Sequence, residues 1–239
     1  MTVPSMGRGS FLGRPRQAPR PPVPHNAHQR AITQMAASIL LDYPSETNLA
    51  KYPVVAGSLA GLPQVIESRL RGFLDYAEQV GHDVLAQEYV TTFDQRRKCT
   101  LYLSYFLTGD TRKRGMALLS FTEAYKAAGW EMAANELPDY LPVVLEFAAV
   151  GDAELAGVLL SSHREGLEVL REALESMASP WAGVVSAVTA TLPPISSRTR
   201  ERVLDLIAGG PPMEMVGVDA LGPLERRVLP IDTVGSGAR

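Results

Sequence analysis

The sequence predicts an all-α fold, a single compact helical domain of about ten helices with no sheet. Apolar residues recur at helical spacing over most of the chain, and Ser, Asp, Gly and Pro residues repeatedly mark helix starts and ends. Only one apolar run is strand-like, and no second one exists to pair with it. A chain of 239 residues, 46% of them hydrophobic, can bury one substantial core or at most two small ones.

Cysteine and charge usage narrow the class of protein. The single cysteine, Cys99, excludes an intramolecular disulfide framework and is typical of a reducing compartment, so we expect a cytoplasmic protein. No apolar run is long enough to span a membrane. Residues 1–30 carry five arginines and no acid, which leaves 18 basic against 26 acidic side chains in the rest. This net charge of −8 disfavours a nucleic-acid binder and suits a basic peptide partner.

Three segments are expected along the chain. Residues 1–27 are rich in Pro, Gly and Arg without apolar periodicity, which indicates a disordered arm. Residues 28–208 form the helical domain. Residues 209–239, with scattered Gly and Pro, are expected to be a flexible tail.

Turn and capping residues divide the first half of the domain into helices. The expected helices run from His28 to Tyr43-Pro44, from Ser45 with an interruption at Pro53, from Gly61-Leu62-Pro63 to Gly81, and from Asp83 to Phe93. The apolar run from Leu101 to Leu107 could be a strand by composition. Because no partner strand is evident, we expect it to be a central buried helix.

The same turn and capping residues divide the second half of the domain into helices. The first expected helix starts at Asp110 or Thr111 and ends at Gly129, and the second runs from Asp139 to about Val150. A third helix starts at Gly151-Asp152, and a fourth starts at the capping-box sequence Ser162 to Glu165. The last two run from Ser179-Pro180 to Pro193-Pro194 and from Ser197 to Ala208. The first helix of this half is expected to bury Met116, Leu119, Tyr125 and Ala128. Gly115 inside it costs about 1 kcal/mol relative to alanine, which predicts a close helix crossing or a ligand there.

The residue types that usually carry catalysis do not form a pattern. The four histidines show no ligand spacing, no glycine loop follows a strand, and Cys99 is best explained as a buried structural thiol. Glu136 and Asp139 could act as an acid–base pair, but acids at such positions more often cap helices. We therefore expect neither an enzyme nor a resident cofactor or metal.

Three charged junctions between apolar helices are the candidate functional positions. In FDQRRK, Asp94 is a cap beside three cations. In GDTRKRG, Arg112 and Arg114 stand in a first helical turn, where they oppose the helix dipole and need a partner, either Asp94 or Glu146 if it is internal. In ELPDYLP, Asp139 takes the cap position of a helix whose direction two prolines fix.

The third junction would form a rigid apolar and anionic corner. The candidate peptide-binding residues from the three junctions are Asp94, Arg112, Arg114, Gly115, Glu136, Leu137, Pro138, Asp139, Tyr140, Leu141, Pro142 and Glu146.

The motifs YVTTFD, GDTRKRGMALL, AYKAAGW and ELPDYLPVVLEF, in this order, resemble one family closely. It is the nitrate reductase molybdenum cofactor assembly chaperone (NarJ) family, within the redox-enzyme maturation chaperones that include the TorD and DmsD groups. LLDYPS, HREGLEVLREALE and SPWAGVVSAVTATLPP extend the likeness to residues 30–194. The Pro-x-Asp-His turn of related chaperones corresponds to Leu137, Pro138, Asp139 and Tyr140, with tyrosine in place of histidine.

This resemblance implies a TorD-like all-helical chaperone that is not an enzyme. It implies binding, in the cytoplasm, to the N-terminal segment of the catalytic (alpha) subunit of respiratory nitrate reductase until the molybdenum cofactor is inserted. It also implies contact with the insertion machinery, a monomeric state, a role in nitrate assimilation and anaerobic respiration, and no nucleic-acid partner. A peptide that is helical when bound, with basic and apolar faces, would lie in a groove with apolar walls and acidic corners.

Two other function classes stay open at this point. One is a helical enzyme that acts on a phosphorylated or nucleotide-like molecule through Asp94, Arg112, Arg114 and Asp139. The other is a ligand-sensing regulator, which the absence of a basic recognition helix disfavours.

Overall fold

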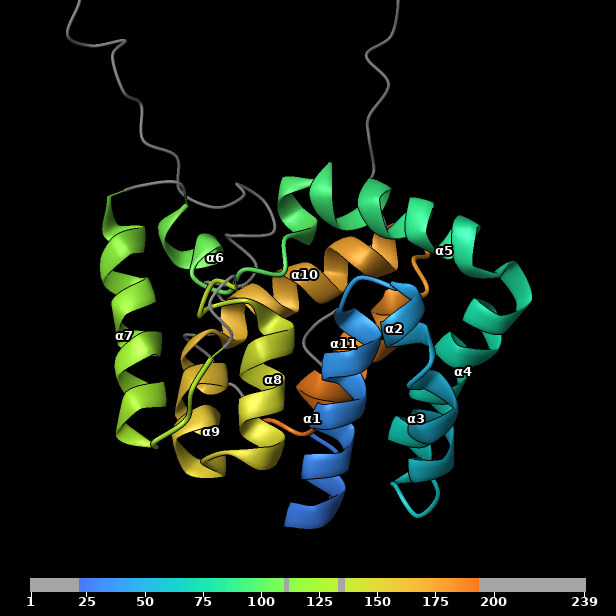
Figure 1. Ribbon diagram of the computed structural model, residues 1–239, viewed down its shortest axis with the longest axis horizontal. Helices are drawn as coiled ribbons and strands as arrows, with labels where there is room; N and C mark the ends of the chain where they lie inside the picture. Colours follow the sequence, from blue (N-terminus) through green and yellow to red (C-terminus); the bar gives the residue numbers. More distant parts are fainter. Residues whose placement is uncertain (1–21, 110–111, 133–135, 194–239) are drawn as a thin grey trace, which may run out of the picture.

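The computed structural model describes residues 22–109, 112–132 and 136–193 of the chain, and the regular elements of this part are helices, apart from one isolated β-bridge (Figure 1). The α-helices are α1 (Ala27–Leu41), α2 (Glu46–Leu49), α3 (Tyr52–Ser58), α4 (Gln64–Val80), α5 (His82–Tyr89), α6 (Tyr105–Thr108), α7 (Lys113–Ala127), α8 (Leu141–Val150), α9 (Ala153–Ser162), α10 (Arg164–Ser176) and α11 (Trp181–Ala190). A π-helical turn, η1 (Val90–Asp94), and a 3-10 turn, η2 (Arg97–Cys99), follow α5. The all-α prediction is confirmed.

Helices α1 and α8 lie side by side at the centre, and α11 packs behind them against α4 (Figure 1). The core is fixed there by an aromatic cluster around the fully buried Trp181, whose ring centroid lies 5.3–5.7 Å from those of Phe73, Tyr89 and Phe93. The indole N–H of Trp181 donates to the carbonyl of Leu40 at 3.1 Å, which satisfies its one polar atom.

Several predicted helix signals are confirmed. The side chain of Ser45 accepts a hydrogen bond from the Asn48 amide and caps α2, and Pro53 lies in the first turn of α3. Asp152 caps α9 by accepting from the amides of Glu154 and Leu155. Gly81, with a positive φ of 76°, separates α4 from α5.

The prediction of a central helix at 101–107 is wrong. The backbone is extended at Tyr102, which forms an antiparallel bridge with Tyr140, and α6 begins only at Tyr105. The Leu103 amide donates to the Asp139 carbonyl at 2.9 Å, and the Leu141 amide donates to the Leu101 carbonyl at 2.8 Å. The ELPDYLP turn therefore supplies the partner that the sequence did not reveal, so the backbone groups of this segment are satisfied without a helix.

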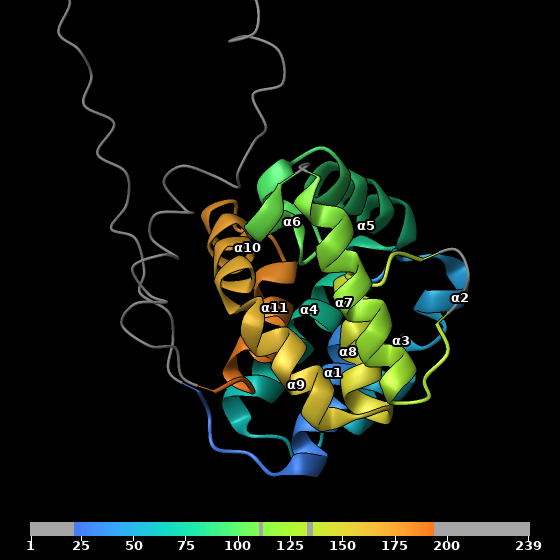
Figure 2. The same ribbon diagram turned by 90° about the vertical axis from the view of Figure 1, so that its left-hand side faces the viewer.

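The predicted core face of α7 is confirmed at Tyr125 and Ala128, which are buried or packed against the core, and is wrong at Met116 and Leu119. Met116 is 69% exposed and Leu119 is 47% exposed, whereas Phe121 and Tyr125 are buried. Helix α7 lies at the left edge of the molecule in Figure 1 and faces the viewer in Figure 2, and its buried residues, Phe121 and Tyr125, belong to its second half. A Cβ on Gly115 would meet no atom within 4 Å, so no close helix crossing explains this glycine. The expected caps Asp110 and Thr111 lie outside the described residues.

The predicted caps at Ser162 and Ser179 are both wrong. Helix α9 extends through Ser162, whose hydroxyl donates to the Val158 carbonyl, so Ser162 does not cap α10. The side chain of Ser179 makes no cap to α11, which begins after Pro180. Val65 of α4 and Val84 of α5 are 47% and 46% exposed.

The ends of the domain are partly described. Of the predicted arm, residues 22–27 are described: the Val23 amide donates to the Ala190 carbonyl at 2.9 Å, Asn26 caps α1 in a capping box with Gln29, and Ala27 is the first residue of α1. The rest of the arm, the predicted helix from Ser197 to Ala208 and the tail lie outside the described residues. Among the described helices, none has both the length and the apolar character needed to cross a membrane.

Candidate functional site

A cleft of about 590 Å³ lies beside α1 and α8, on the side where the segments around 131 and 136 pass. Its lining comes from five parts of the chain. The lining residues are Met35, Ser38, Ile39, Asp42, Asn48, Lys51, Trp130, Glu131, Met132, Glu136, Tyr140, Pro142, Val143 and Glu146. Four of the twelve predicted site residues, Glu136, Tyr140, Pro142 and Glu146, therefore meet in one cavity.

The cleft is acidic. Four carboxylates line it, and Glu131, Glu136 and Glu146 are exposed while Asp42 is half-buried. Lys51 is the one cation in the lining. Like charges gathered in a concave surface with low-dielectric walls focus the field, so this cleft attracts cations.

The walls between the carboxylates are apolar. Met35 and Ile39 of α1, Val143 of α8 and Trp130 all line the cleft. The ring of Trp130 is held by Tyr125 and Phe147, at centroid distances of 5.0 and 5.2 Å. This arrangement offers apolar contact area next to negative charge.

An apolar hollow of about 290 Å³ continues the cleft along α1. It shares Met35 and Ile39 with the acidic cleft and runs between α1, α3 and the end of α8. Val54 and Val150 on its sides are 74% and 65% exposed, which is unusual for large apolar residues. The two hollows together form a trough that is acidic at one end and apolar at the other.

Tyr140 anchors the acidic end. Its hydroxyl lies 3.0 Å from that of Tyr89 and 3.3 Å from a carboxylate oxygen of Asp42, and the Tyr89 hydroxyl also contacts the Leu41 carbonyl at 3.1 Å. Burial raises the pKa of both tyrosines well above the usual value, so both hydroxyls stay protonated and can donate. The network fixes Asp42 at the rim of the cleft.

Arg114 reaches the same region through an aromatic stack. Its guanidinium carbon lies 5.6 Å from the ring centroid of Tyr102, and the Tyr102 ring lies 5.4 Å from that of Tyr140. Burial, and then the negative charges of Glu136 and Asp139, raise the pKa of Tyr102. The stack therefore couples the start of α7 to the wall of the cleft.

The prediction that Asp139 caps α8 and presents its charge to a ligand is wrong. Asp139 is completely buried, and Tyr140 occupies the N-cap position without a side-chain cap. The carboxylate turns inward because Ser104, brought close by the bridge at Tyr102, offers it both an amide and a hydroxyl. Asp139 thus holds two segments together beneath the cleft.

The other predicted residues lie around the cleft without lining it. Leu141 is fully buried, Leu137 is 40% exposed, and the Pro138 carbonyl accepts a hydrogen bond from Tyr125 at 2.6 Å. Arg112 and Gly115 are exposed at the start of α7, and Asp94 is exposed at the end of η1. Among the described residues, neither Asp94 nor Glu146 forms an ion pair with Arg112 or Arg114, and Arg114 instead lies over the ring of Tyr102.

The sequence analysis did not predict the side of the acidic cleft that α1, Asp42 and Trp130 form. Asp42 lies in LLDYPS and Trp130 ends AYKAAGW, two motifs that carry the family resemblance, but neither was taken as a site residue. Met35 and Ile39 have the spacing of an ordinary apolar helix stripe, and such a stripe does not distinguish a groove wall from a core contact. No group of three or more side chains that could hold a metal ion exists among the described residues.

The fold defines a class of protein, that of the helical redox enzyme maturation proteins. A solved structure from Archaeoglobus fulgidus, titled "Putative Redox Enzyme Maturation Protein", matches with a TM-score of 0.51 and 25% identity over 71% of this chain and 97% of that one. The chain belongs to the family described as nitrate reductase delta subunit, which matches residues 59–187. The resemblance to the NarJ group within the TorD-like chaperones is thereby confirmed.

Curated relatives carry two kinds of name. The "Nitrate reductase-like protein NarX" of Mycobacterium tuberculosis is 37% identical over 71% of this chain, and the chain spans only 26% of that protein's length. The "Probable nitrate reductase molybdenum cofactor assembly chaperone NarJ" of Bacillus subtilis is 33% identical over 72% of this chain and 95% of its own length. The assembly chaperone NarJ of Escherichia coli is 32% identical over 49% of this chain and 51% of its own length. The relatives named for assembly are chaperones rather than enzymes, in agreement with the expectation from the sequence.

Proposed function

We propose that this chain is an assembly chaperone for a nitrate reductase and assists insertion of the molybdenum cofactor without being part of the final enzyme. Its family and the names of its Bacillus subtilis and Escherichia coli relatives support this proposal. The relative in which the same domain makes up about a quarter of a longer nitrate reductase-like protein points to the same system.

We further propose that the ligand of the trough is the N-terminal segment of the catalytic subunit, bound as an amphipathic helix with basic residues. The single observation that carries this is the juxtaposition of four carboxylates with the apolar side chains of α1 and α8. A basic side chain of the peptide would pair with Glu136 or Glu146 at the exposed rim. The apolar face would lie on Met35 and Ile39 and continue into the apolar hollow.

Each wall has a separate physical role in this binding. The rim carboxylates are exposed, so they contribute mainly to the rate of association and to the choice of a basic ligand. Burial of apolar surface on α1 supplies affinity at roughly 25 cal/mol per Å² before the cost of ordering the peptide. The tyrosine network and the bridge at Tyr102 hold the acidic end in shape, so little ordering is needed on the chaperone side.

A peptide held in this way keeps the client subunit from completing its fold until the cofactor is in place. The location in the cytoplasm, the monomeric state and a contact with the insertion machinery belong to the same proposal and rest on the family resemblance. A role in nitrate assimilation and anaerobic respiration would follow from the client.

The proposal is tested in two arms. In cells that lack this chain, the nitrate reductase catalytic subunit should accumulate without molybdenum, and expression of the chain should restore its metal content. In a pull-down, the purified chain should retain the full-length catalytic subunit and lose it when the subunit's N-terminal segment is deleted. Normal molybdenum content without the chain would overturn the chaperone assignment, and unchanged retention of the truncated subunit would overturn the assignment of the peptide.

A further inference from the structure

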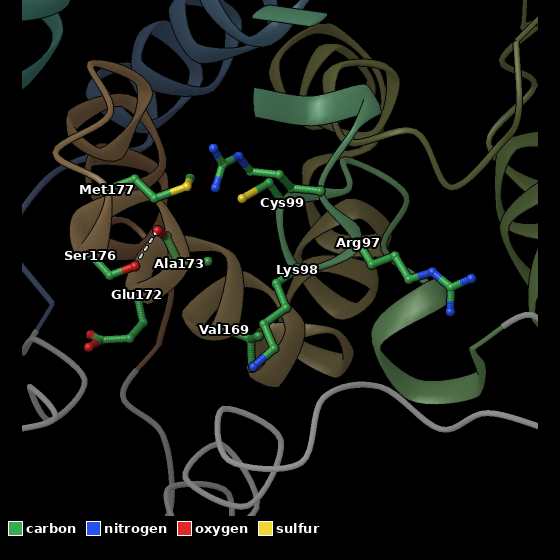
Figure 3. A pocket seen from close by; sticks show the side chains of 9 residues that line it. Arg97, Lys98, Cys99, Val169, Glu172, Ala173, Ser176 and Met177 are labelled. Atoms are coloured by element: carbon green, nitrogen blue, oxygen red, sulfur yellow. Dashed lines mark hydrogen bonds between the residues drawn. The ribbon is translucent and has the colours of Figure 1, made fainter. Parts of the chain in front are cut away.

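A second cleft, of about 480 Å³, lies between the 3-10 turn η2 and the last turns of α10 (Figure 3). It shares no lining residue with the acidic cleft. Nothing in the proposed binding of a basic peptide uses this surface.

The floor of the second cleft is apolar. Cys99 and Val169 are buried at 1% and 2% exposure, and Ala173 and Met177 are half-buried beside them. Figure 3 shows the Lys98 side chain extending towards Val169, whereas Arg97 points away from Cys99. The hydroxyl of Ser176 is already used, since it donates to the Ala173 carbonyl at 2.8 Å. The floor therefore offers apolar contact rather than hydrogen bonds.

The rim of the second cleft is cationic. Arg96, Arg97 and Lys98 are consecutive and all exposed, and Glu172 is the one carboxylate in the lining. Glu172 is itself 3.9 Å from the guanidinium of Arg171, which offsets part of its charge. Burial raises the pKa of the Cys99 thiol, and the positive charge of Arg96, which also lines the cleft, opposes this rise. The sign of the charge is thus opposite to that of the acidic cleft.

The cationic cleft continues into a neighbouring hollow of about 550 Å³. Arg96 and Met177 line both, and the second hollow adds Thr91 and Thr92 of the π-helical turn together with Ser179. Its one carboxylate, Glu88, accepts a hydrogen bond from the Tyr76 hydroxyl at 2.7 Å. π-Helical turns are rare and are often found at functional positions. A trough of this length, with a cation at its middle, suits an extended ligand better than a single small ion.

We propose that this cationic cleft binds an acidic polypeptide segment that carries apolar side chains, at a site separate from the acidic cleft. Charge complementarity to Arg96 and Lys98 selects the acidic ligand, and the floor of Cys99, Val169 and Met177 takes an apolar side chain. The chain would then hold two oppositely charged segments at once. The inference does not depend on the identity of the basic ligand.

The test uses a fluorescent 15-residue peptide of alternating Glu and Leu pairs, titrated with the full chain and followed by anisotropy. The variant Arg96→Glu with Lys98→Glu reverses the rim. The matched control, Lys113→Glu with Lys126→Glu, makes the same change of net charge at exposed positions of α7 that line neither cleft. Thermal unfolding of both variants checks that they fold.

The proposal expects micromolar binding to the parent chain, at least tenfold weaker binding to the rim variant and less than a twofold change in the control. A basic peptide should bind all three proteins alike. Equal losses in both variants would show non-specific attraction and overturn the site. Displacement of the peptide by inorganic phosphate, compared with chloride at the same ionic strength, would also overturn the proposal. Self-association of the chain that depends on the rim residues, without peptide binding, would overturn it as well.

Discussion

The carboxylate of Asp139 accepts two hydrogen bonds from Ser104, one from its amide at 3.1 Å and one from its hydroxyl at 2.6 Å. Both residues are fully buried. The pair joins the turn before α8 to the segment before α6, directly beneath the tyrosines that shape the acidic cleft. A residue that the sequence suggests as part of a binding surface is therefore a support for that surface.

Two substitutions of Asp139 should show whether its carboxylate stabilises the fold or contacts the bound peptide. Asp139→Ala leaves the buried amide and hydroxyl of Ser104 without an acceptor, so we expect a loss of about 2–4 kcal/mol in the free energy of unfolding. Asp139→Asn keeps one acceptor oxygen and should cost less than about 1 kcal/mol. Because the side chain is buried, Asp139→Asn should leave peptide affinity nearly unchanged. Urea unfolding measures the stability of both variants, and a peptide titration measures their affinity. Weak binding by a stable Asp139→Asn variant would show that the Asp139 carboxylate takes part in recognition.

His163 should make stability depend on pH on the acid side. Burial lowers the pKa of its imidazole, against the opposing effects of the Leu159 carbonyl and the Asp139 charge. The unfolded chain then binds a proton at a higher pH than the folded chain does. The contribution of His163 is thus fully present above its unfolded pKa of about 6.5 and is lost as the pH falls below it.

Urea unfolding between pH 7.5 and pH 5 measures that dependence. His163→Gln should flatten the stability profile, while His82→Gln, at an exposed histidine, should leave it as in the parent. Equal profiles for the parent and His163→Gln would show that other groups cause the acid dependence.

Buried tyrosines should limit stability at high pH. Burial raises the pKa of Tyr89, Tyr125 and Tyr140, so the folded state keeps these phenols neutral where the unfolded chain ionises them. Their contribution is present below the unfolded pKa of about 10 and is lost as the pH rises above it. Tyr140→Phe should reduce the slope of the unfolding free energy above pH 10, and an unchanged slope would contradict the burial of this hydroxyl.

Two helical glycines should respond to alanine in opposite directions. A Cβ on Gly166 would lie 2.7 Å from the Phe106 ring, whereas a Cβ on Gly157 would meet nothing within 4 Å. Gly166→Ala should therefore destabilise by roughly 1–3 kcal/mol through overpacking. Gly157→Ala should stabilise by about 0.5–1 kcal/mol because alanine is the better helix former. Thermal unfolding of the two variants tests how closely α10 packs on α6.

The sequence was sufficient for the helical class, the core helices and the position of the ELPDYLP junction. Local signals such as Ser45, Gly81 and Asp152 act within one turn of the chain, so they can be recognised without the fold. Long-range pairing was not predictable in the same way. The bridge from Tyr102 to Tyr140 and the bonds from Ser104 to Asp139 join residues more than 30 positions apart. That pairing converts an expected helix into an extended segment and an expected cap into a buried support.

The site was partly predictable for the same reason. Glu136, Tyr140, Pro142 and Glu146 are close in sequence and stay together in the cleft. The opposite wall comes from α1, about a hundred residues earlier in the chain, where Met35 and Ile39 have the spacing of ordinary core residues. A helical stripe does not record whether its neighbour is another helix of the same chain or a bound ligand.

Isothermal titration of the chain with a synthetic peptide from the N-terminus of the nitrate reductase catalytic subunit tests the central claim most directly. We expect a dissociation constant near 1 µM, about −8 kcal/mol. Glu136→Gln with Glu146→Gln should weaken binding about tenfold at low salt and reduce its salt dependence, because two rim charges are lost. Glu78→Gln with Glu123→Gln, at exposed positions away from the cleft, should change it less than twofold. Absence of binding, or equal affinity in the rim variant and the parent at low salt, would contradict recognition of the peptide in the acidic cleft.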